Sequence, residues 1–109
     1  MFIADAQVHV WGPNTPERPW RDGPVKPHRE PPLTAEELIR EMDVAGVNCA
    51  ILVPPSWDND RNDLCLAAAQ RWPDRFAVMG RMALEAPDAR TKIATWYRQK
   101  GMQIGRAHV

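Results

Sequence analysis

Three polar residues at alternating positions near the N-terminus have the types and spacing for chemistry. Asp5, Gln7 and His9 lie in an otherwise apolar run over residues 2–11, and alternate residues of a β-strand point to the same face. Polar groups on one face of an apolar strand are costly unless they meet partners, a substrate or a metal. His9 falls at the predicted carboxyl end of the strand, where parallel α/β enzymes keep their active sites. The alternative is that His9 is only a hydrogen-bonded strand-end residue.

A second group of polar residues follows the apolar run over residues 49–53. Ser56 can donate a hydrogen bond, and Arg61 can form a bidentate, charge-assisted pair with a carboxylate. Asn62 is predicted near a helix N-terminus, where anions are favoured. Side chains of these three types can bind a carboxylate. The alternative is that residues 60–63 are a capped helix start with solvated charges.

The segment over residues 12–32 contains most of the 11 prolines of the chain. Proline fixes φ and removes a backbone donor, so this density excludes a regular element. A loop of this length is usually functional or a linker, and only one strand precedes it. We therefore predict a lid over the end of the first strand, with Trp20, Arg21 and His28 facing a ligand. A surface loop stiffened by prolines is the alternative.

Three strand–helix repeats are predicted to position these side chains. Thr34 can cap a helix, Glu37 can bond back to the cap, and Gly46 suits the left-handed position after the helix. The run over 49–53 is apolar on both faces, which is typical of a buried parallel strand. The other predicted elements are a first strand over 2–8, a helix from 59 or 60 to 72, a strand over 75–82 and a helix from 88 to 101. Short connections favour parallel strands with right-handed crossovers.

The opening segment resembles the start of amidohydrolase superfamily proteins, in the amidohydrolase-2 branch that includes lactone hydrolases and decarboxylases. That family begins with a strand ending in Asp-x-His-x-His, whose histidines ligate a divalent metal inside a (β/α)8 barrel. His9 matches the second histidine, Gln7 replaces the first, and Trp11 follows. The resemblance covers residues 2–102 and also rests on the segments Pro54-Pro55-Ser56-Trp57, Asp60-Arg61-Asn62 and Pro73-Asp74-Arg75-Phe76.

The resemblance implies a fold, a reaction and a site. The fold is α/β, a partial TIM (β/α)8 barrel of about three βα units. The reaction is the opening of a small carboxylated ring, such as a lactone, by activated water; a decarboxylase of the same branch and a non-catalytic α/β binding or oligomerisation module are the alternatives. A divalent metal, zinc or manganese, is implied at Gln7 and His9. An amide is a weak ligand, so we expect weak or absent binding. The predicted substrate contacts are Trp11, Trp20, His28, Ser56, Arg61 and Asn62.

Composition excludes several other classes of protein. Acidic and basic residues balance at 14 each, which gives no electrostatic argument for nucleic acid or an anionic membrane. No membrane-spanning run or secretory signal is visible. The two cysteines, Cys49 and Cys65, do not have the close spacing of a metal clip. We predict a cytoplasmic protein that binds a small-molecule substrate and whose full-length parent can be a homo-oligomer.

The C-terminal segment leads to a prediction about the gene. A complete barrel needs about 250 residues, against 109 here. Residues 104–109 resemble the translation of a common sequencing-library adapter. We therefore predict that residues 1–102 are the N-terminal part of a barrel and that residues 103–109 are a non-native tail. A genuine short C-terminus is the alternative. The family's remaining histidines and its general-base aspartate would lie beyond residue 109, so no catalytic residue is assigned within the chain.

Overall fold

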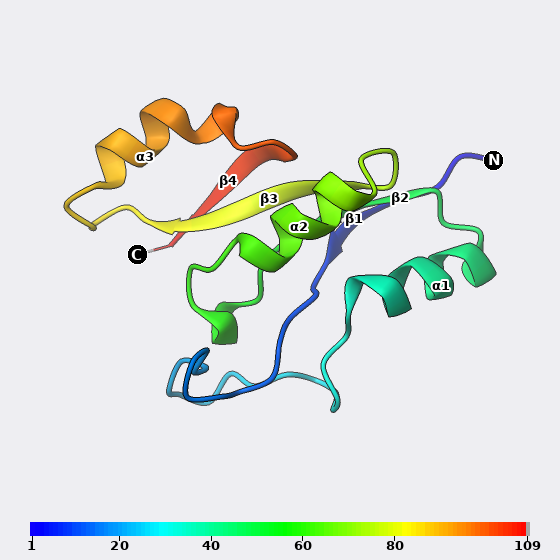
Figure 1. Cartoon of the computed structure of the whole chain (residues 1–109), viewed down its shortest axis with the longest axis horizontal. Coiled ribbons are helices and arrows are strands. Elements are labelled where there is room, and N and C mark those ends of the chain that lie inside the picture. Colours follow the sequence, from blue (N-terminus) through cyan, green and yellow to red (C-terminus); the bar gives the residue numbers. More distant parts are fainter. Residues whose placement is uncertain (109) are drawn as a thin grey trace.

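The computed structural model describes residues 1–108, with side chains described as far as residue 103. Within that range the chain forms a parallel sheet in the order β1-β2-β3-β4, with helices between the strands (Figure 1). The elements are β1 (Ala4–Val8), α1 (Ala35–Ala45), β2 (Cys49–Leu52), η1 (Ser56–Asp58, a 3-10 turn), α2 (Asp63–Arg71), β3 (Phe76–Ala83), α3 (Ala89–Thr95), η2 (Trp96–Arg98, a 3-10 turn) and β4 (Met102–His108). This is the predicted α/β class with parallel strands.

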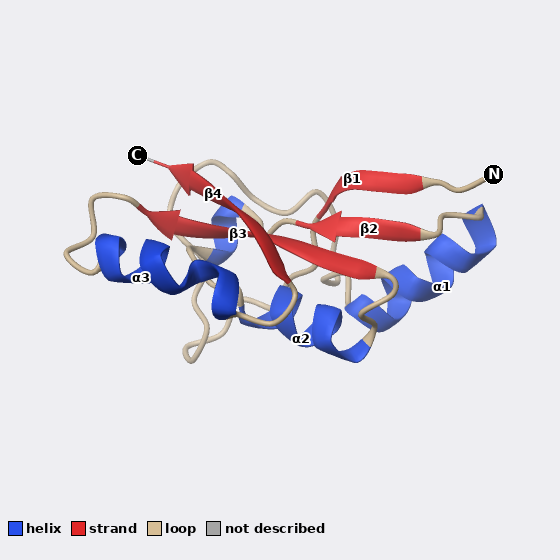
Figure 2. Ribbon diagram, turned by 90° about the horizontal axis from the view of Figure 1, so that it is seen from above, coloured by secondary structure: helices blue, strands red, loops and turns tan. Residues whose placement is uncertain are grey.

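The two faces of the sheet have different surroundings. Figure 2 shows the three helices of the described chain on one side of the strands. On that covered face, Leu52 and Val78 are 0% exposed and belong to the main core cluster. On the opposite, open face, Ile51 and Ala77 pair across the strands and are only half-buried. The core therefore sits between the sheet and its single helical layer.

Helix α1 forms where its local signals predict it. The Thr34 hydroxyl oxygen accepts a hydrogen bond from the Glu37 backbone N–H at 3.2 Å, which satisfies one donor of the first turn. Gly46 ends the helix with φ at 75°, a conformation that costs glycine little. Leu38 and Met42 are buried against the sheet. No helix of the described chain is long and apolar enough to span a membrane.

The two later helices are shorter than predicted. Helix α2 begins at Asp63 rather than at 59 or 60, because residues 56–58 form the turn η1 and Asn59 has a φ of 60°. Leu64 is 36% exposed, whereas Cys65 and Ala68 are buried. Helix α3 ends at Thr95, and η2 replaces its expected last turn.

A fourth strand, β4, follows the three predicted βα units. Gly101, with φ at 96°, reverses the chain after η2, and the backbone of β4 pairs in parallel with β3. This pairing does not test the origin of residues 103–109, so the non-native tail stays a prediction.

The first strand also differs from a regular alternation. Asp5 pairs with Ala50 and Val8 pairs with Leu52, so three steps along β1 match two along β2. Ala50 and Leu52 are both on the covered face, which places Asp5 and Val8 on that face as well. The bulge breaks the strict alternation on which the prediction of a shared face for Asp5 and His9 was based. The bulge arises from the pairing of β1 with β2, so the sequence of β1 alone does not reveal it.

Candidate functional site

His9 lies directly after β1, at the carboxyl end of the sheet. Its Nδ1 is 2.7 Å from the backbone oxygen of Val53, which lies directly after β2. A carbonyl oxygen only accepts hydrogen bonds, so Nδ1 carries a proton and, in the neutral ring, Nε2 keeps its lone pair. The ends of two strands thus hold one imidazole in a defined tautomer, with Nε2 as the nitrogen for a substrate, a proton or a metal.

An aromatic cluster extends from this imidazole through Trp57. The cluster consists of His9, Trp57, Trp11 and His28. Trp57 meets His9 edge-on, with ring centroids 5.8 Å apart, and meets Trp11 at 5.3 Å and 88°. His28 lies 5.4 Å from Trp11 on the exposed side. Edge-to-face contacts of this kind favour one arrangement of the rings. The cluster brings together three predicted site residues, His9, Trp11 and His28, through Trp57.

A network of charged residues fixes the long loop next to this cluster. The Arg18 network consists of Arg18, Asp58, Asp63 and Arg61. Arg18 makes a forked pair with Asp58, at 3.2 and 2.7 Å, and a second with Asp63, at 2.7 and 2.8 Å. Asp58 is 2% exposed, so its charge depends on these partners. The predicted lid over residues 12–32 is therefore anchored at its middle to η1 and to the start of α2.

The same contacts shift the pKa values of two residues in the network. Hydrogen bonding to Asp63 is the largest cause that raises the pKa of Arg18 above its ordinary value, despite its partial burial. In turn, the Arg18 hydrogen bond holds the pKa of the Asp63 carboxyl below its usual range. Both groups stay charged at neutral pH, so the pairing does not switch off under physiological conditions.

The remaining predicted contacts make bonds within the protein. Arg61 donates to the backbone oxygen of Pro19 at 2.9 Å and lies 3.4 Å from Asp58 Oδ1. Trp20 donates its indole N–H to the Gly12 backbone oxygen at 3.0 Å. Ser56 begins η1 beside Trp57 and is half-buried. Ser56 is thus placed close to the aromatic cluster in sequence, whereas Arg61 and Trp20 hold the loop.

Asn62 fastens the end of β3. Its side-chain amide donates to the Arg81 backbone oxygen at 3.0 Å, and its amide oxygen accepts from the Arg81 backbone N–H at 2.7 Å. The Arg81 side chain is 7% exposed, and its Nε lies 3.7 Å from Asp60. The predicted anion-binding amide therefore serves as a backbone partner for the strand.

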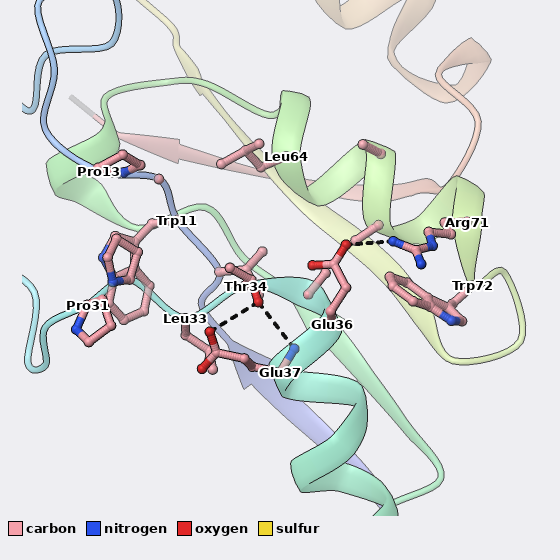
Figure 3. A pocket seen from close by; sticks show the side chains of 16 residues that line it. Trp11, Pro13, Pro31, Leu33, Thr34, Glu36, Glu37, Leu64, Arg71 and Trp72 are labelled. Atoms are coloured by element: carbon pink, nitrogen blue, oxygen red, sulfur yellow. Dashed lines mark hydrogen bonds and ion pairs between the residues drawn. The ribbon is translucent and has the colours of Figure 1, made fainter.

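A cavity of about 500 Å³ lies between α1 and α2, with Trp11 in its wall (Figure 3). Its walls include Trp11, Leu33, Leu64 and Trp72, and the ion pair of Glu36 with Arg71 at 2.6 Å crosses one side. The cavity is lined by the helical layer and by residues 10–13, which follow the end of β1. Trp11 forms part of its wall and also belongs to the aromatic cluster.

The residues present do not make a complete metal site. His9 suits a ligand, because metal-bound histidines commonly donate their other N–H to a backbone carbonyl, as Nδ1 does here. Gln7 offers only a neutral amide on an exposed side chain. Across the described residues, no group of three or more His, Cys, Asp or Glu side chains could hold a metal ion. We derive no chemical step through a metal.

Comparisons with known proteins agree with this architecture. The fold is that of a partial TIM barrel, as predicted. The structure is similar to the crystal structure of a probable 2-pyrone-4,6-dicarboxylic acid hydrolase from Acinetobacter baumannii with citric acid bound, with a TM-score of 0.72 and 20% sequence identity. The match covers 100% of this chain and 38% of that protein, so the chain spans well under half of its neighbour's length. No family model and no curated protein matches the chain.

Sequence reasoning missed the residues that hold the site together. Trp57 carried a detectable signal, since a large aromatic residue follows two prolines at a strand end. Arg18 and Asp58 carried none, because they are 40 positions apart and ordinary charged residues in loops.

Proposed function

We propose that this chain is part of a hydrolase that opens a small, carboxylated, lactone-like ring with water. The observation that carries the proposal is the His9 imidazole held at the carboxyl ends of β1 and β2, in a fold shared with a probable pyrone-dicarboxylate hydrolase. Strand carboxyl ends are where barrel enzymes bind and convert substrates. In such a reaction water oxygen bonds to the ring carbonyl carbon, the ring C–O bond breaks, and the ring oxygen takes a proton.

The residues of this chain would bind and orient rather than complete the reaction. His9 Nε2 would contact the reacting end of the ring, and the neighbouring aromatic residues would exclude water from it. Ser56, at the start of η1, would donate a hydrogen bond to the substrate. Because Arg61 and Asn62 already bond to backbone groups, we assign them a supporting role in the loops.

Product analysis tests this proposal. The longest protein that the gene encodes is incubated with 2-pyrone-4,6-dicarboxylic acid and a panel of carboxylated lactones. We expect ring opening with uptake of one water, and loss of activity in His9→Ala. Release of CO2 would instead identify a decarboxylase. Absence of both reactions at saturating substrate would contradict the enzyme and favour the non-catalytic module.

Metal analysis of the same preparation is a separate test. Because Gln7 offers an amide where imidazole would bind zinc well, we expect substoichiometric zinc and manganese, and activity that survives chelation. Stoichiometric zinc that chelation removes together with activity would contradict this expectation.

A further inference from the structure

We infer that Arg18 is a positioning residue for the His9 imidazole, acting through Asp58 and Trp57. The inference rests on the proposed role of His9 at the reacting end of the substrate. It adds one requirement to the proposed site. The orientation of a histidine at a strand end depends on a cation in the long loop.

The first link is the pairing of Arg18 with a buried carboxylate. Arg18 Nη2 is 2.7 Å from Asp58 Oδ2 and its Nε is 3.2 Å from Oδ1, so both carboxylate oxygens are engaged by one planar group. Asp58 is 2% exposed. A carboxylate that is buried to this extent without its partner is strongly unfavourable, and the chain relieves the cost by moving the group toward water.

Arg61 does not replace Arg18 at this carboxylate. Its Nη1 is 3.4 Å from Asp58 Oδ1, near the limit of a useful hydrogen bond, and the same nitrogen donates to Pro19 O at 2.9 Å. One long contact supplies little of the stabilisation that a fork provides. Arg18 is thus the main partner of Asp58.

The second link is the turn that carries both Asp58 and Trp57. The turn η1 spans only Ser56–Asp58, so a displacement of Asp58 moves its neighbour Trp57. Trp57 is 7% exposed, and its backbone oxygen accepts from the Arg21 N–H at 2.8 Å, a second contact from the same loop. The loop therefore holds η1 at two points, at Asp58 through Arg18 and at the backbone of Trp57 through Arg21.

The third link is the contact of Trp57 with His9. The hydrogen bond from Nδ1 to Val53 O fixes one edge of the imidazole, and Trp57 packs against the ring at a centroid distance of 5.8 Å. A single hydrogen bond leaves a terminal ring torsion broad. Packing by Trp57 restricts that torsion and keeps Nε2 pointing in one direction. Loss of Arg18 is expected to release this restriction.

The test compares three variants by nitrogen-15 NMR of histidine-labelled protein, with His9 assigned from His9→Gln. Arg18→Met removes the charge at similar length, and Arg18→Lys keeps the charge but loses the fork. Arg71→Met is the matched control, because it breaks an ion pair of 2.6 Å with Glu36 between α1 and α2. We expect wild type and Arg71→Met to show His9 protonated on Nδ1. We expect both Arg18 variants to shift toward the mixed tautomers of a free imidazole and to lose near-ultraviolet tryptophan dichroism.

Activity supplies a second readout. In the Arg18 variants kcat/KM is expected to fall about tenfold to a hundredfold, as for a misplaced catalytic group, with Arg71→Met unchanged. Should Arg18→Met fail to fold, Arg18→Lys decides the question. A wild-type His9 pattern in a folded Arg18 variant would overturn the inference. If the wild-type protein opens no lactone but its His9 tautomer still depends on Arg18, the proposed function fails and this inference stands.

Discussion

The two faces of the sheet use similar residues but meet different surroundings. On the covered face, Leu52 and Val78 are 0% exposed beneath the helices. On the open face, their strand neighbours Ile51 and Met79 are only half-buried, although they are equally apolar. The strands thus have the composition of a sheet that is buried on both sides.

The two faces of the sheet therefore have different roles. One face stabilises the described chain, and the other remains available for further contacts. The covered face supplies the hydrophobic stabilisation, because its side chains are removed from water. The open face retains apolar area that favours association. The candidate site lies at the end of the sheet, where loops rather than helices make the contacts.

The largest expected effect comes from truncating one side chain on each face. Leu52→Ala leaves a cavity in the core and should lower the free energy of unfolding by about 2–5 kcal/mol. Ile51→Ala, one residue away on the open face, should cost less than half as much. Urea unfolding of both variants measures the difference. Equal losses would show that the open face is as well packed as the covered one.

An intermediate effect is expected for the stability of the fold in acid. It tests the ion pairs of the strand-end loops, which belong to neither face of the sheet. Arg18 lowers the pKa of Asp63 in the folded protein, so this pair stabilises the fold above the unfolded pKa and is lost as pH falls below about 4. Solvent screening at the exposed Asp63 keeps the effect below about 1 kcal/mol. Unfolding at pH 7 and pH 3 should show this loss in the wild type. In Arg18→Met the Asp63 contribution should be absent, and an unchanged pH dependence would argue against it.

A smaller effect on stability is expected at the edge of the sheet. Ile3 and Phe2 are 40% and 73% exposed beside β1, and exposed apolar edges promote pairing between chains. Ile3→Lys should change the free energy of unfolding by no more than about 0.5 kcal/mol while reducing self-association in sedimentation velocity. Undiminished association would assign it to the open face instead.

The labelling rates of the two cysteines test the assignment of the two faces of the sheet. Cys65 belongs to α2 and is 2% exposed, and burial raises the pKa of its thiol to about 12. Cys49 is half-buried on the open face. A disulfide reagent at pH 8 should therefore label Cys49 quickly and Cys65 slowly, as measured in Cys65→Ser and Cys49→Ser. Similar rates in the two variants would contradict the assignment of faces.

Local signals explain which parts of the fold could be predicted. Thr34, Glu37 and Gly46 specify both ends of α1 within a dozen residues, and the apolar run 49–53 specifies β2. The predicted start of α2 was wrong because Asn59 and Asp60 have the residue types of helix caps. In the structure, the chain forms the turn η1 at this point and Asn59 follows it at positive φ. The bulge in β1 depends on its pairing with β2.

The candidate site was predicted less completely for a related reason. Residue type alone indicated His9, Trp11 and His28, which carry rings suited to binding. Whether Arg61 would meet a ligand or a backbone oxygen depended on the path of a proline-rich loop over residues 12–32, which periodicity does not describe. The forked pairs of Arg18 required the same path.

Asn62 holds the backbone of β3 near its carboxyl end without a neighbouring strand. By supplying both a donor and an acceptor to Arg81, its amide does for the tip of β3 what an adjacent strand would do. Both partners lie within residues 62–81, so this corner of the opening is held without a contact from β4.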